Sequence, residues 1–137
     1  MTDSSKQTGK NQIRWLELPI KKLSDARAFY TNVFTGMVLQ PYPSAPGGST
    51  IGYIIPHEDC QSIPVFMYEA GDDYIAPDTA TCMYVYTDLD LALLKNRVLN
   101  NGGQLINGSP IFPHPVTGQQ CIKVKDNSGN VIGIAQI

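Results

Sequence analysis

The chain has 137 residues, 42% of them hydrophobic, which is enough for one globular domain with a buried core. Charged residues make up 16%, the formal net charge is −2 and the pI is near 5.5, so we expect no basic surface for nucleic acid. No apolar run approaches the roughly 20 residues of a membrane span. These features predict a cytoplasmic protein with a disordered polar tail at 1–12, and neither nucleic acid nor a membrane as partner.

The first predicted element is a strand over residues 13–20, whose side chains alternate between two faces. Trp15 and Glu17 fall on one face, and Leu16 and Leu18 on the other. A helix is expected next, capped by Ser24 and stopped by a glycine at position 36, because apolar residues recur at a helical spacing. Its apolar positions are Ala26, Phe29, Tyr30 and Val33. Three further strands are then expected, at 38–41, 50–55 and 63–68.

The same order of elements recurs after a polar linker at 70–79. A strand is expected at 81–86, then a helix capped by Asp88 and ended by Gly102 and Gly103, and then further strands. These strands are expected at 104–106, 119–125 and 131–136. We therefore predict two repeats, 13–69 and 80–137, in one domain spanning 13–137. The alternative is that any two strand–helix–strand units look this similar.

Three cysteines, Cys60, Cys82 and Cys121, are odd in number and widely spaced. This spacing fits neither a zinc motif nor a disulfide framework, so we expect reduced and mostly buried thiols. His57 and His114 both lie in proline-flanked segments, so we expect both to be solvated loop residues.

Several short motifs occur together in a fixed order. They are Trp15-Leu16-Glu17-Leu18-Pro19-Ile20, Ala26-Arg27-Ala28-Phe29-Tyr30, Thr87-Asp88-Leu89-Asp90, Gly102-Gly103 and Asp126-x-x-Gly129-Asn130-x-Ile132-Gly133. In this order they resemble the vicinal oxygen chelate superfamily, which includes glyoxalase I, extradiol dioxygenases, fosfomycin-resistance enzymes and bleomycin-binding proteins. The resemblance implies an α+β fold of two βαβββ modules, forming an incomplete barrel around a cavity. It also implies a homodimer.

Metal-dependent members of that superfamily supply His, Glu or Gln ligands from the first and last strands of each module. The resemblance carries those positions onto Trp15, Thr81 and Gly133, and the internal repeat adds Val65. None of these side chains is a strong donor for a divalent cation. We therefore expect no metal and no other cofactor. A shift of two residues along the first strand would instead bring Glu17 inward, but one carboxylate does not make a metal site.

The resemblance, combined with strand alternation, predicts which residues line the cavity. They are Trp15, Glu17, Val65, Met67, Thr81, Met83, Val85 and Gly133. This mainly apolar set suits a hydrophobic or aromatic small molecule. Tyr42, Tyr53 and Tyr68 could face either the helices or the cavity. The alternative is that all of these side chains fill a closed core, as in small barrels.

Three functions remain open from the sequence. The first is a metal-independent protein that binds, and so sequesters, a hydrophobic or aromatic compound. The second is a glyoxalase-like lyase or isomerase that uses Glu17 as a general base or recruits a divalent metal. The third is a module that only mediates self-association.

Overall fold

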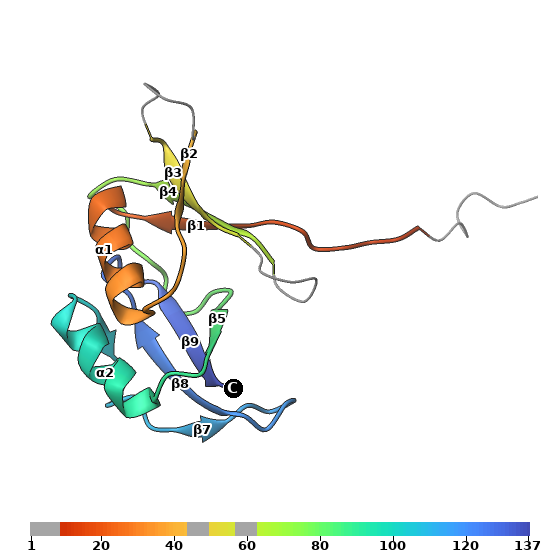
Figure 1. Ribbon diagram of the computed structural model, residues 1–137, viewed down its shortest axis with the longest axis vertical. Coiled ribbons are helices and arrows are strands. Elements are labelled where there is room, and N and C mark those ends of the chain that lie inside the picture. Colours follow the sequence, from red (N-terminus) through yellow and green to blue (C-terminus); the bar gives the residue numbers. More distant parts are fainter. Residues whose placement is uncertain (1–8, 44–49, 57–62) are drawn as a thin grey trace, which may run out of the picture.

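Two halves with the same order of elements follow each other along the chain (Figure 1). The computed structural model describes residues 9–43, 50–56 and 63–137. The first half contains β1 (Leu16–Ile20), α1 (Leu23–Val33), β2 (Gln40–Tyr42), β3 (Gly52–Ile55) and β4 (Val65–Glu69). The second half contains β5 (Met83–Thr87), α2 (Leu91–Asn100), β6 (Gln104–Leu105), β7 (Phe112–Pro113), β8 (Gln120–Lys125) and β9 (Val131–Gln136).

Each half forms its own sheet, and the two sheets have the same topology. Sheet A has the order β1-β4-β3-β2, and sheet B has the order β5-β9-β8-β6, with β7 also paired to β8. In each sheet the first strand of the half runs parallel to its last strand, and the remaining pairs are antiparallel. The two sheets do not close into a barrel in the described part of the chain. This arrangement confirms the predicted α+β class and the βαβββ order; β7, two residues long and ending in proline, was not predicted.

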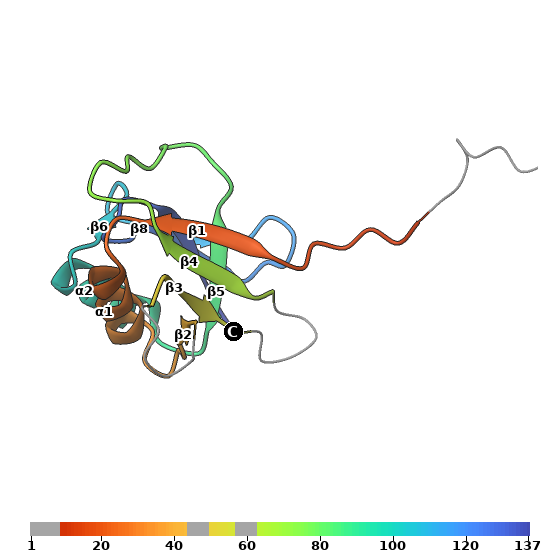
Figure 2. The same cartoon turned by 90° about the horizontal axis from the view of Figure 1, so that it is seen from above.

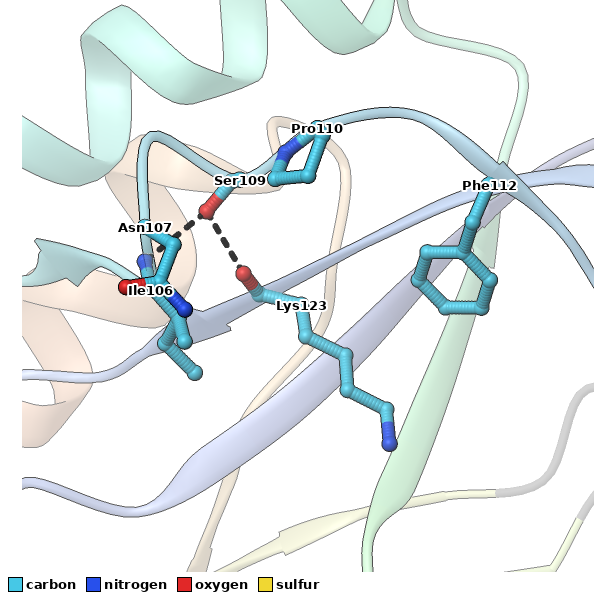
Figure 3. A pocket seen from close by; sticks show the side chains of 6 residues that line it. All are labelled: Ile106, Asn107, Ser109, Pro110, Phe112 and Lys123. Carbon is cyan, nitrogen blue, oxygen red and sulfur yellow. Dashed lines mark hydrogen bonds between the residues drawn. The ribbon is translucent and has the colours of Figure 1, made fainter.

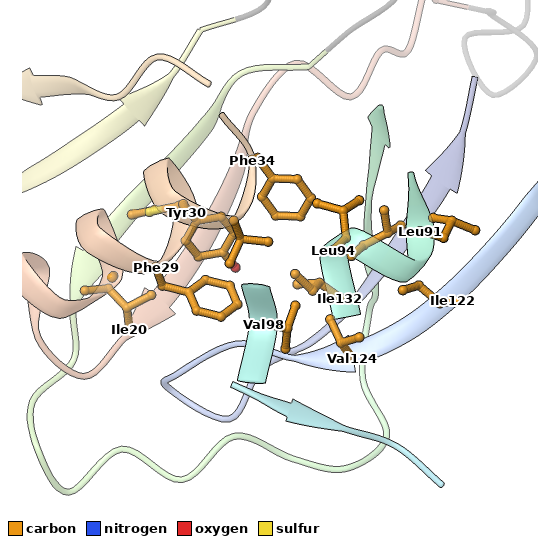
Figure 4. Packing of buried hydrophobic residues seen from close by; sticks show 14 residues of the cluster. Ile20, Phe29, Tyr30, Phe34, Leu91, Leu94, Val98, Ile122, Val124 and Ile132 are labelled. Atoms are coloured by element: carbon orange, nitrogen blue, oxygen red, sulfur yellow. The ribbon is translucent and has the colours of Figure 1, made fainter. Parts of the chain in front are cut away.

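One hydrophobic core joins the two halves (Figure 4). The helices lie side by side on the same side of the molecule in both overall views (Figures 1 and 2), and α1 contacts α2. The predicted apolar face of α1 is fully buried, and α2 buries Leu91, Leu94 and Val98. Ile20 of β1, Ile122 and Ile132 pack against these helices. Burial of this shared face holds the sheets in a fixed relation, since both contribute to the same core.

The helix starts differ from the predicted caps. The N-cap residue of α1 is Lys22, before Ser24, and the Leu23 amide donates to the carboxylate of Glu69 at 3.0 Å. The N-cap residue of α2 is Asp90, after Asp88. Neither side chain of the two N-cap residues makes a capping hydrogen bond. Within the described parts of the chain, neither helix is long and apolar enough to cross a membrane.

Candidate ligand-binding site

A cavity of about 400 Å³ lies between the two sheets, beside their edge strands β1 and β5. We call it the crevice. Its walls come from Leu16, Glu17 and Leu18 of β1, from Val65 of β4 and from residues 81–83 at the start of β5. The segment that joins the halves adds Tyr74, Pro77 and Ala80. Both halves therefore contribute to one mainly apolar space.

Hydrogen bonds from Asn130 close one end of the crevice. Its amide nitrogen donates to the carbonyl oxygen of Pro19 at 2.7 Å, which ties the start of β9 to β1. Its amide oxygen accepts a hydrogen bond from the Tyr74 hydroxyl at 2.6 Å. Burial raises the pKa of Tyr74, and the nearby charge of Asp126 adds to this effect. The phenol therefore keeps its proton for this bond.

An aromatic cluster lies on the face of sheet A that points away from the helices. The Trp15 ring stacks on Phe66 with centroids 5.9 Å apart, and Tyr42 approaches the same ring edge-on at 6.0 Å. We call Trp15, Tyr42 and Phe66 the aromatic platform. Trp15 is 48% exposed and Tyr42 is 49% exposed, so about half of the surface of these two platform residues is open to a ligand.

Glu17 connects the platform to the crevice. The strand register pairs Glu17 with Phe66, so the carboxylate stands beside the platform on the same face of the sheet. Glu17 also lines the crevice. No hydrogen bond or ion pair engages its carboxylate within the residues that the structure describes. The aromatic platform and the crevice therefore meet at Glu17.

The predicted face of the first strand agrees with the structure, although β1 begins at Leu16 rather than at residue 13. Leu18 packs against the shared core, and Ile20 is fully buried in it. Trp15 lies just before the strand and stacks on Phe66 on the opposite face. The alternative had Leu16 and Leu18 facing the cavity and Trp15 under the helices. Its first part agrees with the structure, since both leucines line the crevice and Trp15 does not. Its second part does not, because Trp15 stacks on Phe66.

The predicted faces of β4 and β5 are shifted by one residue. Met67 is completely buried in the core and does not line the crevice. Val85 packs against the same core. A shift of one residue moves every side chain of a strand to the other face. Val65 and Met83 border the crevice, because they lie beside the gap between the sheets, and Thr81 lines it as well.

Gly133 lies beneath an aromatic ring instead of opening into a cavity. A side chain at this position would overlap ring atoms of Tyr84, its register partner on β5. The ring of His114 meets Tyr84 edge-on at 5.4 Å. Burial raises the pKa of the Tyr84 phenol. In sheet A the ring of Phe66 covers Gly52 in the same way.

The sequence analysis missed Phe66 of the platform and several crevice residues, among them Leu16, Leu18, Tyr74 and Asn130. It also missed the ring of Tyr84 over Gly133. A glycine inside a strand indicates a close approach of another group, and here that group is an aromatic ring on the neighbouring strand. Gly52 and Gly133 were therefore the available signal for Phe66 and Tyr84. No comparable signal pointed to Asn130.

The residues at the expected ligand positions do not fit a divalent metal. Trp15, Val65 and Gly133 offer no donor side chain, and Thr81 offers one neutral hydroxyl. No group of three or more His, Cys, Asp or Glu side chains within residues 9–43, 50–56 and 63–137 is arranged to hold a metal ion. His114 is engaged locally, since its Nδ1 accepts hydrogen bonds from the amides of Val116 and Thr117, each at 3.2 Å.

Two of the three cysteines lie in the described parts of the chain, and both are free thiols. Cys121 is buried and Cys82 is partly buried at the wall of the crevice. Burial raises the pKa of both thiols, which favours their unreactive protonated form. His57 and Cys60 lie outside the described residues.

A second hollow, of about 210 Å³, lies between the loop after β6 and strand β8 (Figure 3). The Ser109 hydroxyl donates to the carbonyl oxygen of Lys123 at 2.6 Å and accepts from the Ile106 amide at 3.1 Å. Asn107 and Ser109 both adopt positive φ angles, near 50°. The two hydrogen bonds of Ser109 hold this turn against β8, and none of the predicted site residues lines the hollow.

A known protein family matches nearly the whole chain. Residues 12–134 match the model of the Glyoxalase/Bleomycin resistance protein/Dioxygenase superfamily. The chain belongs to this superfamily. The match covers both halves and both of the sheets described above. Among curated proteins, none has a significantly similar sequence.

Several solved structures share the fold of this superfamily member. A glyoxalase-related enzyme from Fulvimarina pelagi aligns with a TM-score of 0.65 and 17% identity, over 93% of this chain and 89% of that one. The fosfomycin resistance protein FosX from Listeria monocytogenes, solved with Mn(II) and a dihydroxypropylphosphonic acid, aligns with a TM-score of 0.61 and 11% identity, over 94% and 93%. TioX from Micromonospora sp. ML1 aligns with a TM-score of 0.56 and 19% identity, over 92% and 98%. At these identities the comparisons establish the fold alone.

Proposed function

We propose that this protein binds a small, flat and largely apolar molecule without a metal, and thereby sequesters it. A ring of the ligand would stack on the aromatic platform, and its remainder would enter the crevice. The position of Glu17 carries this proposal, because this one residue both lines the crevice and stands beside Phe66. A single ligand can therefore contact both surfaces.

The size and chemistry of the site support this proposal. Ligand pockets commonly have volumes of roughly 300–1,000 Å³ and mainly apolar walls with a few polar groups. The crevice, at about 400 Å³, is within that range, and Leu16, Leu18, Val65 and Met83 make it mainly apolar. Stacking on exposed aromatic rings is favourable for flat molecules, since it buries apolar area on both partners.

The superfamily also includes metal-dependent enzymes, and FosX was solved with Mn(II). The donor set of this chain supports binding rather than that chemistry. A second candidate function is a lyase or isomerase in which Glu17 acts as a general base. It is favoured by one observation, that Glu17 lines the crevice and its carboxylate has no partner among the described residues. Turnover lost in Glu17→Gln, with ligand binding retained, would support this alternative.

Trp15 provides the test, because it is the only tryptophan of the chain. A flat aromatic compound that binds should quench or shift its fluorescence. In calorimetry, Trp15→Ala should weaken binding by roughly 1–3 kcal/mol through lost apolar contact. Leu99→Ala is the matched control, since Leu99 is an exposed apolar residue of α2, outside the crevice and the platform. Unchanged affinity in both Trp15→Ala and Phe66→Ala would contradict the proposal.

A further inference from the structure

We infer that the preferred ligand is an aromatic cation, that is, a flat ring system bearing a positively charged nitrogen. This inference rests on the proposed function, because it names the chemical class that the same site would select. It depends on the charge of the side chains around the crevice and on the electronic character of the platform beside it.

Among the described residues that line the crevice, Glu17 alone carries a formal charge. Of the described residues that line it, the others are apolar or neutral polar, including Thr81, Cys82 and Asn130. Within the described parts of the chain, no Lys, Arg or His forms an ion pair with Glu17. A ligand cation placed in the crevice would therefore meet one carboxylate and, among the described lining residues, no positively charged side chain.

The platform favours a cation for a separate reason. The faces of Trp, Tyr and Phe rings carry partial negative charge and attract cations within about 6 Å of the ring centroid. Trp15, Tyr42 and Phe66 offer three such rings close to one another, and Phe66 is the register partner of Glu17. An anionic ligand would be repelled by the carboxylate and by the ring faces together.

Three positively charged side chains, those of Arg14, Lys123 and Lys125, are not among the residues that line the crevice. The guanidinium of Arg14, next to Trp15 in the chain, donates to the Gln12 side chain at 2.7 Å and does not line the crevice. Lys123 lines the separate hollow beside β8, although its charge also acts to lower the pKa of Cys82 at the crevice wall. Lys125 forms an ion pair with Asp78 at 3.1 Å. None of the three lines the crevice or forms an ion pair with Glu17 in the described parts of the chain.

Three probes of similar shape and different charge test the inference. They are N-methylquinolinium, which carries a fixed positive charge, quinoline, which is neutral at neutral pH, and 2-naphthoate, which is an anion. Calorimetric titration of the full chain should rank them in that order. The cation should bind roughly three- to tenfold more tightly than quinoline, given the usual size of exposed charge pairs and cation–π contacts. Added salt should weaken the binding of the cation and leave quinoline unchanged.

Glu17→Gln should remove this preference, since it keeps the shape of the side chain and removes its charge. The affinity for N-methylquinolinium should fall to that for quinoline, and the affinity for quinoline should stay the same. Asp88→Asn is the matched control, because Asp88 is an exposed carboxylate outside the crevice and should leave all three affinities unchanged. If quinoline binds as tightly as the cation in the unaltered protein, the charge preference is overturned and the proposed function stands. If none of the probes binds, both fall.

Discussion

The Tyr30 hydroxyl donates a hydrogen bond of 2.7 Å to the buried carboxylate of Asp126, which lies 96 positions further along the chain. The other oxygen of that carboxylate accepts hydrogen bonds from the amides of Ser128 and Asn130, each at 2.9 Å. The carboxylate thus stabilises the turn between β8 and β9 and fixes this turn against α1. A buried carboxylate satisfied by several donors is held in one geometry.

The same turn makes further contacts with the first half. The Ser128 hydroxyl accepts a hydrogen bond from the Lys21 amide at 2.9 Å, and the Asn127 amide group donates to the carbonyl oxygen of Asp25 at 2.8 Å. Asn130, at the end of the turn, reaches Pro19 and lines the crevice. The position of this turn therefore helps to set the width of the crevice.

Tyr30→Phe should destabilise the protein by roughly 1–3 kcal/mol. The substitution keeps the ring in the core and removes the 2.7 Å hydrogen bond to a buried carboxylate oxygen, which would keep only the longer one from the Asn130 amide group at 3.3 Å. Chemical denaturation measures the change in the free energy of unfolding. Tyr86→Phe serves as control, because Tyr86 is 48% exposed and should change stability little. Equal stability of the two variants would mean that the Tyr30–Asp126 bond contributes nothing measurable.

The stability of the protein should carry a pH dependence from Asp126. Burial raises the pKa of this carboxyl, and the hydrogen bonds from Tyr30 and Asn130 only partly oppose the shift. Between the ordinary aspartate value of about 3.9 and the raised native value, the folded state binds more protons than the unfolded state. The contribution of Asp126 is therefore greatest below that window and is lost as the pH rises through it.

The comparison of the unaltered protein with Asp126→Asn isolates this effect from other titrating groups. The difference in the free energy of unfolding, unaltered protein minus variant, should decrease as the pH rises through the window and become constant above it. A difference that increases with pH would show that the native pKa of Asp126 is lowered instead of raised.

The sequence predicted the elements well because apolar spacing decides them. The i, i+3, i+4, i+7 pattern of Ala26, Phe29, Tyr30 and Val33 coincides with the buried face of α1. Similarly, Leu18 and Ile20 alternate with polar Glu17, so the inner face of β1 could be assigned.

The faces of β4 and β5 could not be assigned in this way. The runs Val65-Phe66-Met67-Tyr68 and Met83-Tyr84-Val85-Tyr86 are hydrophobic or aromatic on both faces. Alternation therefore shows that they are strands, but it does not show which face of each strand is turned to the core. Only tertiary packing places Met67 toward the helices and Phe66 toward the platform. The docking of Asn130 onto Pro19 joins segments that are 111 positions apart, and no local pattern predicts it.

The purified protein should carry no stoichiometric divalent metal. At the expected ligand positions, Trp15, Val65 and Gly133 lack donors and Thr81 has no charge to offset that of the ion. Native mass spectrometry of untreated protein, with elemental analysis, measures this directly. A content of about one nickel, zinc, manganese or iron ion per chain, lost in Glu17→Ala, would refute the metal-free proposal and favour an enzyme.

We also expect a dimer. Each sheet ends in an edge strand, and apolar side chains in or beside sheet A stay exposed beyond the platform, such as Ile51 at 57% and Ile63 at 39%. A second copy would cover edges and apolar area of this kind. Sedimentation over a concentration series should give a species of twice 15.0 kDa. A single species of 15.0 kDa throughout the micromolar range would argue against it.

The contact between Gly133 and Tyr84 can be tested with a double-mutant cycle. Gly133→Ala should destabilise the protein by roughly 1–3 kcal/mol, because the new methyl group overlaps ring atoms of Tyr84. In a Tyr84→Ala background the same substitution should cost much less, since the three nearest atoms to the added methyl group all belong to that ring.

Gly52 provides the control for this cycle, because its ring partner is not its only obstacle. A methyl group at Gly52 would overlap the ring of Phe66 and also the backbone carbonyl oxygen of Met67. Gly52→Ala should therefore remain costly in a Phe66→Ala background, since a backbone atom cannot move aside as a side chain can. Rescue at Gly133 without rescue at Gly52 would establish that the Tyr84 ring alone requires the glycine on β9. An equal cost of Gly133→Ala with and without the Tyr84 ring would instead trace the requirement to the backbone of β9.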